Sequence, residues 1–120
     1  MQFMVIGKDG KDPEALTRRK KARQKHLETL ETMLEEGTML FAAALVDEKG
    51  TMKGSMVVCD FPSRKELEEW LIHEPYVVGG VWKNIDIQEC KVGKPFEKLV
   101  KPSIYNTSNF EDLYPITSMV

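Results

Sequence analysis

The sequence has very few residues of the kinds that build metal and redox sites. It contains two histidines and two cysteines among 120 residues, and neither Cys59 nor Cys90 belongs to a C-x-x-C pair. His73 precedes Glu74, but no second histidine follows to complete an H-E-x-x-H zinc motif. Dinucleotide-binding and P-loop fingerprints are also missing. We therefore expect no metal, no cofactor, and two free thiols buried in strands.

Long apolar runs and a dominant charge are likewise absent. No segment approaches the roughly 20 apolar residues that a membrane-spanning helix needs. The stretch MQFMVIGKDG at residues 1–10 lacks the features of an export signal. The formal net charge of -2 gives no general attraction to nucleic acid. We therefore expect a cytoplasmic protein with no membrane partner and no nucleic-acid partner.

One basic stretch bears on that expectation. TRRKKARQK, residues 17–25, carries six positive charges and no acid. Binding of RNA or phosphate would require interleaved aromatic residues or a glycine-rich loop, and this stretch has neither. We therefore interpret most of it as a solvated helix face, with nucleic-acid binding as the weaker alternative.

Hydrophobic patterns divide the chain into strands and helices of a single domain. Four strands are predicted, over residues 3–7, 39–46, 55–61 and 81–92. A long helix runs from Pro13 to about Glu36 and ends at Gly37. A second begins at a capping box that opens with Ser63 and continues to about His73. The order β-α-β-β-α-β is that of the α+β ferredoxin-like fold, a four-stranded antiparallel sheet with both helices on one face.

This fold leaves the other face of the sheet uncovered. Because an exposed apolar sheet face is unfavourable in water, we expect a homodimer that packs sheet against sheet through it. The predicted domain spans residues 1–93, and residues 94–120 form a C-terminal extension. The aromatic residues of the extension are Phe96, Tyr105, Phe110 and Tyr114. Such a composition is unusual for a disordered tail, so we expect the extension to dock on its own domain or on a partner subunit.

The long helix carries polar side chains on the face that should contact the sheet. The apolar residues of that face are Leu16, Leu27, Leu30, Met33 and Leu34. Arg19, Arg23 and His26 project into the same face. A histidine on an apolar face is more often a satisfied core residue than a catalyst, and arginine stems often extend past an apolar edge to water. His26 and Arg23 are therefore candidate site residues with a structural alternative.

The stretch LIHEPYVVGGVW, residues 71–82, places a carboxylate where the second helix ends. The apolar stripe of that helix consists of Leu67, Trp70 and Leu71. Glu74 is the next position on the same face. Helix ends usually favour cations, so a carboxylate there calls for a histidine or arginine partner. The alternative is a glutamate that bends outward at a frayed helix end.

Two more side chains near these positions can hydrogen-bond a ligand. Ser55 opens the third strand, where a serine is usually structural. Tyr76 offers an apolar ring with a polar tip, and such a tyrosine often serves only to cover a core. Sequence order alone does not establish a Ser-His-acid triad, because that arrangement is defined by geometry.

These segments together resemble the YciI-like (YCII-related) family. RQKHLETL, at residues 23–30, is similar to the family's R-x-x-H-L segment. Residues 54–87 are similar to its second half, which has G-S, a strand, a capped helix and D-P-[FY]. The resemblance covers about residues 1–92. It implies a dimeric α+β barrel and small isomerases or dehydrochlorinases that act on aromatic or lactone substrates.

The resemblance also implies roles for individual residues. His26 and Glu74 match the histidine and the aspartate that are regarded as the family's catalytic pair, and Arg23 and Ser55 match its arginine and serine. The family usually has aspartate at the position of Glu74. Glutamate keeps the charge but moves the carboxylate by about one bond length, a shift to which catalytic geometry is sensitive.

Two functions of different classes therefore stand side by side. In the first, His26 is the general acid/base of an isomerase- or lyase-like reaction on a small cyclic or aromatic compound, and Glu74 orients it. Arg23, Ser55 and Tyr76 would then bind the substrate. In the second, the chain is a non-catalytic dimeric module that binds a small ligand or another protein, and the polar cluster is retained for structure.

Overall fold

The structure, a computed structural model, describes residues 1–105 of the chain. Its elements follow the predicted order, with one short helix added before the last strand. They are β1 Gln2–Asp9, α1 Ala15–Glu36, β2 Met39–Val46, β3 Met52–Asp60, α2 Arg64–Leu71, α3 Pro75–Val78 and β4 Trp82–Cys90, followed by a 3₁₀ helix, η1, over Lys94–Leu99.

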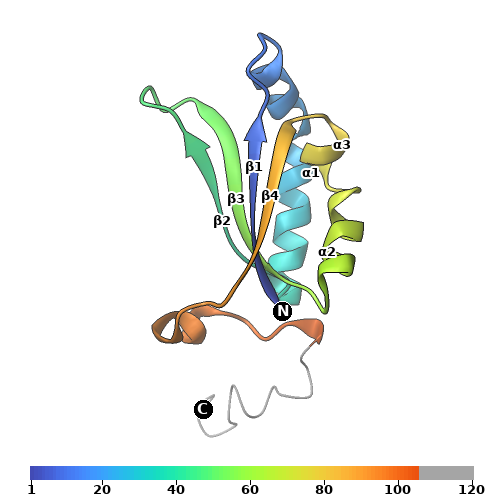
Figure 1. The fold of residues 1–120 in the computed structure, drawn as a ribbon, viewed down its shortest axis with the longest axis vertical. Coiled ribbons are helices and arrows are strands. Elements are labelled where there is room, and N and C mark those ends of the chain that lie inside the picture. Colours follow the sequence, from blue (N-terminus) through green and yellow to red (C-terminus); the bar gives the residue numbers. More distant parts are fainter. Residues whose placement is uncertain (106–120) are drawn as a thin grey trace, which may run out of the picture.

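The four strands form one antiparallel sheet in the order β2-β3-β1-β4. All three α-helices lie against one face of this sheet, with α1 running along its length (Figure 1). This order and this one-sided layering are those of the ferredoxin-like fold. The predicted α+β fold is therefore confirmed.

Local sequence signals set the helix ends. α1 ends at Gly37, whose φ of 74° lies in the left-handed region that glycine adopts readily. α2 begins at Ser63, whose Oγ accepts a hydrogen bond of 3.2 Å from the Glu66 N–H. α2 ends at Leu71, earlier than the predicted end at His73. The proline after Glu74 accounts for the extended backbone of Glu74, since a residue before proline is driven out of the helical region.

The core lies between the sheet and the helices. The sheet contributes Phe3, Val5, Val57 and Cys59, and the helices contribute Met33, Leu67 and Leu71. Burial raises the pKa of the Cys59 thiol to about 12, so this thiol stays protonated at neutral pH. Cys90 is also a free thiol but is only partly buried, because it ends the edge strand β4.

The buried face of α1 agrees with the predicted one only in part. Its buried residues are Arg19, His26 and Met33. These positions are spaced by seven residues, or two helical turns, so they form one line along the helix. Leu16, Leu27 and Leu34 are instead 37%, 42% and 55% exposed. The leucine pattern was misleading because two of the innermost positions on this helix are polar and have buried partners.

The sheet face opposite the helices carries apolar side chains from three strands. Met4 pairs with Val58 and Ile6 with Met56 between β1 and β3, and Phe41 of β2 also pairs with Val58. These residues alternate with the core residues, so they project away from the helices. Phe41 is 64% exposed. We call this surface the open sheet face.

The described part of the C-terminal extension crosses the end of α1. Ser103 is buried there, and the ring of Tyr105 lies 6.3 Å from the ring of Phe61. Two other aromatic residues of the extension, Phe110 and Tyr114, lie outside the described residues. The predicted docking of that remaining part stays a prediction.

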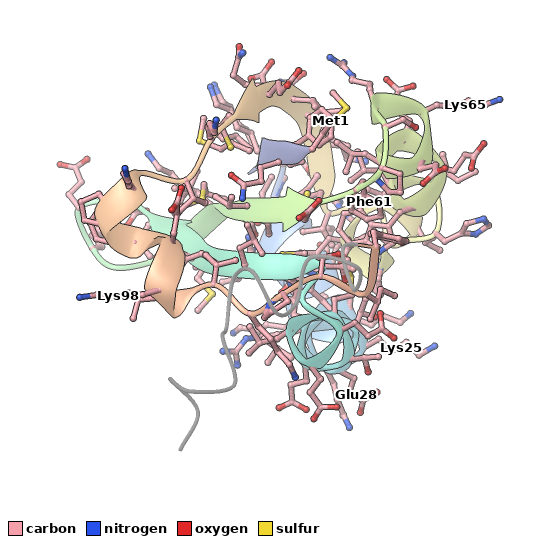
Figure 2. The ribbon with its side chains drawn as sticks, turned by 90° about the horizontal axis from the view of Figure 1, so that it is seen from below. Met1, Lys25, Glu28, Phe61, Lys65 and Lys98 are labelled. Carbon is pink, nitrogen blue, oxygen red and sulfur yellow. The ribbon has the colours of Figure 1, made fainter. Side chains whose placement is uncertain are left out.

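The outer face of α1 carries charged side chains. Figure 2, which looks along the helix, shows Lys25 and Glu28 pointing away from the sheet. Within the basic stretch 17–25, Arg19 is buried and Arg18 is half-buried, and the other basic residues are exposed. The interpretation of most of this stretch as a solvated face is therefore confirmed, and Arg19 is buried on the side that was predicted to contact the sheet. No helix in the described part of the chain is long and apolar enough to cross a membrane.

Replacing Gly37 with alanine should destabilise the protein more than replacing Gly50 does. Both glycines have a left-handed φ, 74° and 81°, so alanine at either position carries a backbone strain of about 1–2 kcal/mol. A Cβ at Gly37 would also lie 2.3 Å from the carbonyl oxygen of Pro102, whereas one at Gly50 meets nothing within 4 Å. Urea unfolding of the two variants measures the difference. Equal losses of stability would show that the extension does not press on this turn in solution.

Candidate active site

His26 and Glu74 meet at the centre of the helical layer. Nδ1 of His26, on α1, is hydrogen-bonded to Oε1 of Glu74. His26 is 5% exposed and Glu74 is 0% exposed. The structure therefore brings together the two residues predicted to form a catalytic pair, and it excludes the alternative in which Glu74 bends outward.

Glu74 does not occupy the position in the helix that the sequence pattern indicated. It lies beyond α2, in an extended conformation, and is the N-terminal cap of α3. Its Oε2 accepts a hydrogen bond of 2.6 Å from the Tyr76 N–H. Pro75, predicted to stop the second helix, lies beyond its end and is also the first residue of α3, where its missing N–H is harmless. The carboxylate thus lies at the positive end of a short helix, an arrangement that the macrodipole favours.

Two aromatic rings fix the orientation of the His26 imidazole. The Tyr76 ring stacks on it with centroids 3.8 Å apart and an interplanar angle of 12°. The Trp82 ring meets it edge-on at 5.9 Å. With Nδ1 held by Glu74, the imidazole is restrained in position and in rotation.

The second ring nitrogen of His26 has no partner within the described residues. No side-chain nitrogen or oxygen in residues 1–105 is both sealed from solvent and unpaired, so Nε2 faces open space. Because Glu74 accepts the Nδ1 proton, Nε2 carries the lone pair in the neutral imidazole. The ring therefore presents a free basic nitrogen on the side away from Glu74.

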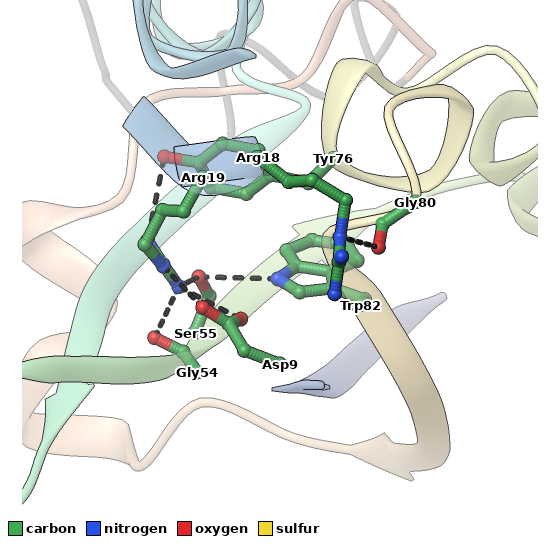
Figure 3. Close-up of polar contacts among 8 residues, drawn as sticks. All are labelled: Asp9, Arg18, Arg19, Gly54, Ser55, Tyr76, Gly80 and Trp82. Atoms are coloured by element: carbon green, nitrogen blue, oxygen red, sulfur yellow. Dashed lines mark hydrogen bonds and ion pairs between the residues drawn. The ribbon is translucent and has the colours of Figure 1, made fainter. Parts of the chain in front are cut away.

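Arg19 organises a second polar cluster beside this pair (Figure 3). Its Nε donates to Oδ2 of Asp9 over 2.7 Å. Its Nη2 donates to Ser55 Oγ over 2.6 Å and to the Gly54 carbonyl over 2.5 Å. Its Nη1 donates to the Tyr76 hydroxyl over 3.3 Å. The side chains of Arg19 and Asp9 are only 3% and 4% exposed, so this is a buried and hydrogen-bonded ion pair.

Ser55 receives a further hydrogen bond from the indole of Trp82. The Nε1–H of Trp82 donates to Ser55 Oγ over 3.3 Å. The Trp82 ring lies over Gly7, where an added Cβ would lie 2.3 Å from the ring. A glycine in β1 thus makes the space that lets Trp82 reach Ser55.

A pocket of about 220 Å³ opens between α1 and the strands β2 and β3. Its polar lining consists of Arg19, Arg23, His26, Ser55 and Tyr76. Its apolar lining includes Leu27, Leu30, Ala42, Ala44, Met56 and Val57. Glu74 lies behind His26 and does not line the pocket. No group of three or more His, Cys, Asp or Glu side chains within residues 1–105 is placed to hold a metal ion.

The predicted substrate-binding residues differ in their surroundings. Ser55 and Tyr76 are 4% and 1% exposed and are both bonded to Arg19. Burial raises the pKa of Tyr76, although the nearby Arg19 guanidinium opposes the shift. Arg23 is exposed at the pocket rim and has no hydrogen bond or ion pair with another described residue. The structure thus places all three at the pocket but does not test their roles.

Sequence reasoning did not assign Arg19, Asp9 and Trp82 to the site. Arg19 lies two helical turns before His26, and that spacing was a usable signal. Asp9 and Trp82 carried no such signal, because their contacts depend on how the ends of β1 and β4 meet in the sheet.

The comparisons with known sequences agree with one another. The profile of the YCII-related domain matches residues 1–91. Protein YciI of Escherichia coli O6:H1 is 29% identical over 105 residues, which cover 82% of this chain and 99% of that protein. A Haemophilus influenzae protein is 28% identical with the same coverage.

A solved structure supports the fold. The 5-chloro-2-hydroxyhydroquinone dehydrochlorinase TftG of Burkholderia phenoliruptrix AC1100, in complex with 2,5-dihydroxybenzoquinone, matches with a TM-score of 0.66 and 23% sequence identity. The match covers 79% of this chain and 98% of TftG. With a domain match over most of its length and relatives matched end to end, this chain belongs to the YCII-related family.

Proposed function

We propose that this protein is a small enzyme in which His26 transfers protons to and from a cyclic or aromatic compound, as an isomerase or a dehydrochlorinase-like lyase does. One observation carries the proposal. The His26 imidazole is bound to Glu74 through Nδ1 and has a free Nε2 beside a pocket. An imidazole that acts as a general base needs this arrangement, in which one nitrogen is held in place and the other is free to take a proton.

Glu74 acts on the reaction through His26. Its carboxylate holds the Nδ1 proton and so selects the tautomer whose Nε2 is basic. It also stabilises the imidazolium that forms when Nε2 takes a proton, because that cation remains next to a carboxylate. The second oxygen of Glu74 is held by the Tyr76 N–H, so the carboxylate cannot rotate away from the ring.

The size and lining of the pocket support a small ring compound. An apolar protein cavity of about 150 Å³ is enough to bind benzene, and this pocket has about 220 Å³. Its alanine and leucine side chains suit the faces of a ring, and its polar side chains suit the substituents of a ring. Arg23 at the rim is placed to pair with an anionic substituent, and Ser55 and Tyr76 are placed to hydrogen-bond ring oxygens.

One structural neighbour supports the proposal of this class of chemistry. TftG is a dehydrochlorinase of a chlorinated hydroxyhydroquinone and was captured with a dihydroxybenzoquinone. Hydroxylated and chlorinated single-ring compounds are therefore the first substrates to test. The non-catalytic binding module remains the competing function, since the Arg19–Asp9 and His26–Glu74 pairs are also satisfied without a substrate.

We also propose that the chain forms a homodimer through the open sheet face. That face bears Met4, Ile6, Phe41, Met56 and Val58. A second copy offers the same apolar surface, so a two-fold pairing covers both faces at once.

Replacing His26 with glutamine should abolish turnover and leave the fold intact. The glutamine amide can still donate to Glu74, but it cannot act as a base, so we expect turnover to fall by about 10²–10⁴-fold. The measurement is the rate on a panel of hydroxylated, chlorinated and lactone ring compounds, beginning with 5-chloro-2-hydroxyhydroquinone. The control is His73→Gln, which changes the other, exposed histidine.

Two outcomes would contradict the enzyme proposal. One is a wild-type protein that binds compounds of this panel and converts none of them, which favours the binding module. The other is a His26→Gln variant that is folded and as active as the His73→Gln control.

Replacing Phe41 with glutamate should convert the dimer into a monomer. Phe41 is exposed in the single chain, so the change places a charge on the open sheet face without disturbing the core. Sedimentation velocity measures the mass of both proteins, and the exposed Val46→Glu in the same strand serves as the control. A wild-type chain that sediments as a monomer would rule out this assembly.

A further inference from the structure

Both hydroxyl groups of the pocket accept hydrogen bonds from Arg19. Ser55 Oγ accepts from Arg19 Nη2 and also from the Trp82 indole. A serine hydroxyl has two acceptor positions and one proton, so both of its acceptor positions are occupied. The Tyr76 hydroxyl accepts from Arg19 Nη1.

The protons of these two hydroxyls have no acceptor within the described residues. The carbonyl of Gly54 accepts from Arg19, and both carboxylate oxygens of Asp9 face the same guanidinium. Ser55 and Tyr76 both line the pocket that His26 faces. Their protons are therefore left to donate to whatever occupies that pocket.

We propose that Ser55 and Tyr76 form a pair of hydrogen-bond donors for an oxygen atom that becomes negatively charged, and that Arg19 sets their direction. This inference rests on the proposed function, since it concerns the same pocket. It names the substrate class: a ring compound with a carbonyl or hydroxyl oxygen that can become an enolate or phenolate. Two fixed donors favour an anionic oxygen over a neutral one, and such donors are strongest where water is excluded.

The donor pair completes a proton-transfer step with His26. Nε2 takes a proton from the carbon next to a carbonyl, the C–H electron pair forms a C=C bond, and the carbonyl π pair moves to the oxygen, where Ser55 and Tyr76 donate to it. In a substrate with a second C=C bond conjugated to the enolate, re-forming the carbonyl shifts that bond, and its electron pair takes the proton from His26 at the far carbon, which is an isomerisation. In a substrate with chlorine on the carbon next to the deprotonated one, the pair instead forms a C=C bond between these two carbons and chloride leaves with the C–Cl electron pair, which is an elimination of HCl.

Arg19 is a positioning residue in this account. Its charge is balanced by Asp9, and it reaches the pocket oxygen through the two hydroxyls. Because Arg19 and Trp82 occupy both acceptor positions of Ser55, and Arg19 donates to Tyr76, the two hydroxyls are turned to donate.

The inference can be tested by binding alone, with 4-nitrophenol as the probe. Its phenol and phenolate forms absorb at different wavelengths, so a spectrophotometric pH titration reports which form is bound. We expect the wild-type protein to bind the phenolate and to lower the apparent pKa of the bound probe by about one unit or more. Ser55→Ala and Tyr76→Phe should each weaken phenolate binding about 10- to 100-fold, because each removes one hydrogen bond to a charged oxygen.

The controls separate this inference from the proposed function. Ser63→Ala and Tyr105→Phe remove hydroxyls outside the pocket and should leave the titration unchanged. His26→Gln should also keep the phenolate bound, even though turnover is lost. If the wild-type enzyme is active but the Ser55→Ala and Tyr76→Phe variants give the same pH titration of the bound probe as the wild type, the donor pair alone is overturned. If the wild-type protein binds the phenolate but turns over no substrate, only the proposed function is overturned.

A double-mutant cycle tests the role given to Arg19. Arg19→Lys keeps the positive charge but cannot hold both hydroxyls, so the pKa shift of the bound probe should shrink. In a variant that carries both Ser55→Ala and Tyr76→Phe, adding Arg19→Lys should not change the pKa of the bound probe any further. If it still alters the titration there, Arg19 acts on the anion directly. A wild-type protein that does not bind 4-nitrophenol, or binds only its phenol form, would overturn the inference as a whole.

Discussion

The hydrogen bond between His26 and Glu74 is the interaction on which the rest of the site depends. It joins the long helix α1 to the segment between α2 and β4, two parts of the chain that are 48 residues apart. A buried carboxylate without a partner is strongly destabilising, and both oxygens of Glu74 are occupied, one by the imidazole and one by the Tyr76 N–H. The same contacts that stabilise α3 therefore hold the ring in place and leave its Nε2 free.

A second buried ion pair, Arg19 and Asp9, also contacts Tyr76. Asp9 holds the Arg19 guanidinium, whose carbon lies 4.7 Å from the centre of the Tyr76 ring. Tyr76 thus stacks on the base and is hydrogen-bonded to the arginine that orients the pocket hydroxyls. One tyrosine couples a basic nitrogen and a group of hydrogen-bond donors around a single pocket. Acid/base chemistry on a polarised ring needs these two components together.

The fold could be predicted from the sequence because it rests on local periods and caps, whereas the pairing of His26 with Glu74 was predicted from the resemblance to the YCII-related family. Strand alternation, the glycine after α1 and the serine before α2 gave the topology, and helical spacing placed both residues on buried faces. The position of Glu74 as the N-terminal cap of α3 was not predictable, because it depends on α2 ending at Leu71 and a new helix beginning at Pro75. Helical spacing placed Arg19 on the sheet-facing side of the first helix, but its part in the site was missed, since its buried partner Asp9 is brought near only by the assembled sheet and helix.

The most direct test of this account is the position of the proton on the His26 ring. Nitrogen-15 NMR of selectively labelled protein, at about pH 8 where free imidazole is neutral, distinguishes the two tautomers. The account predicts a proton on Nδ1 and a lone pair on Nε2 in the wild-type protein. In Glu74→Gln, where the amide no longer fixes the ring in this way, it predicts a mixture of tautomers. A wild-type imidazole with its proton on Nε2 would contradict the account, because the nitrogen facing the pocket would then have no lone pair to accept a proton.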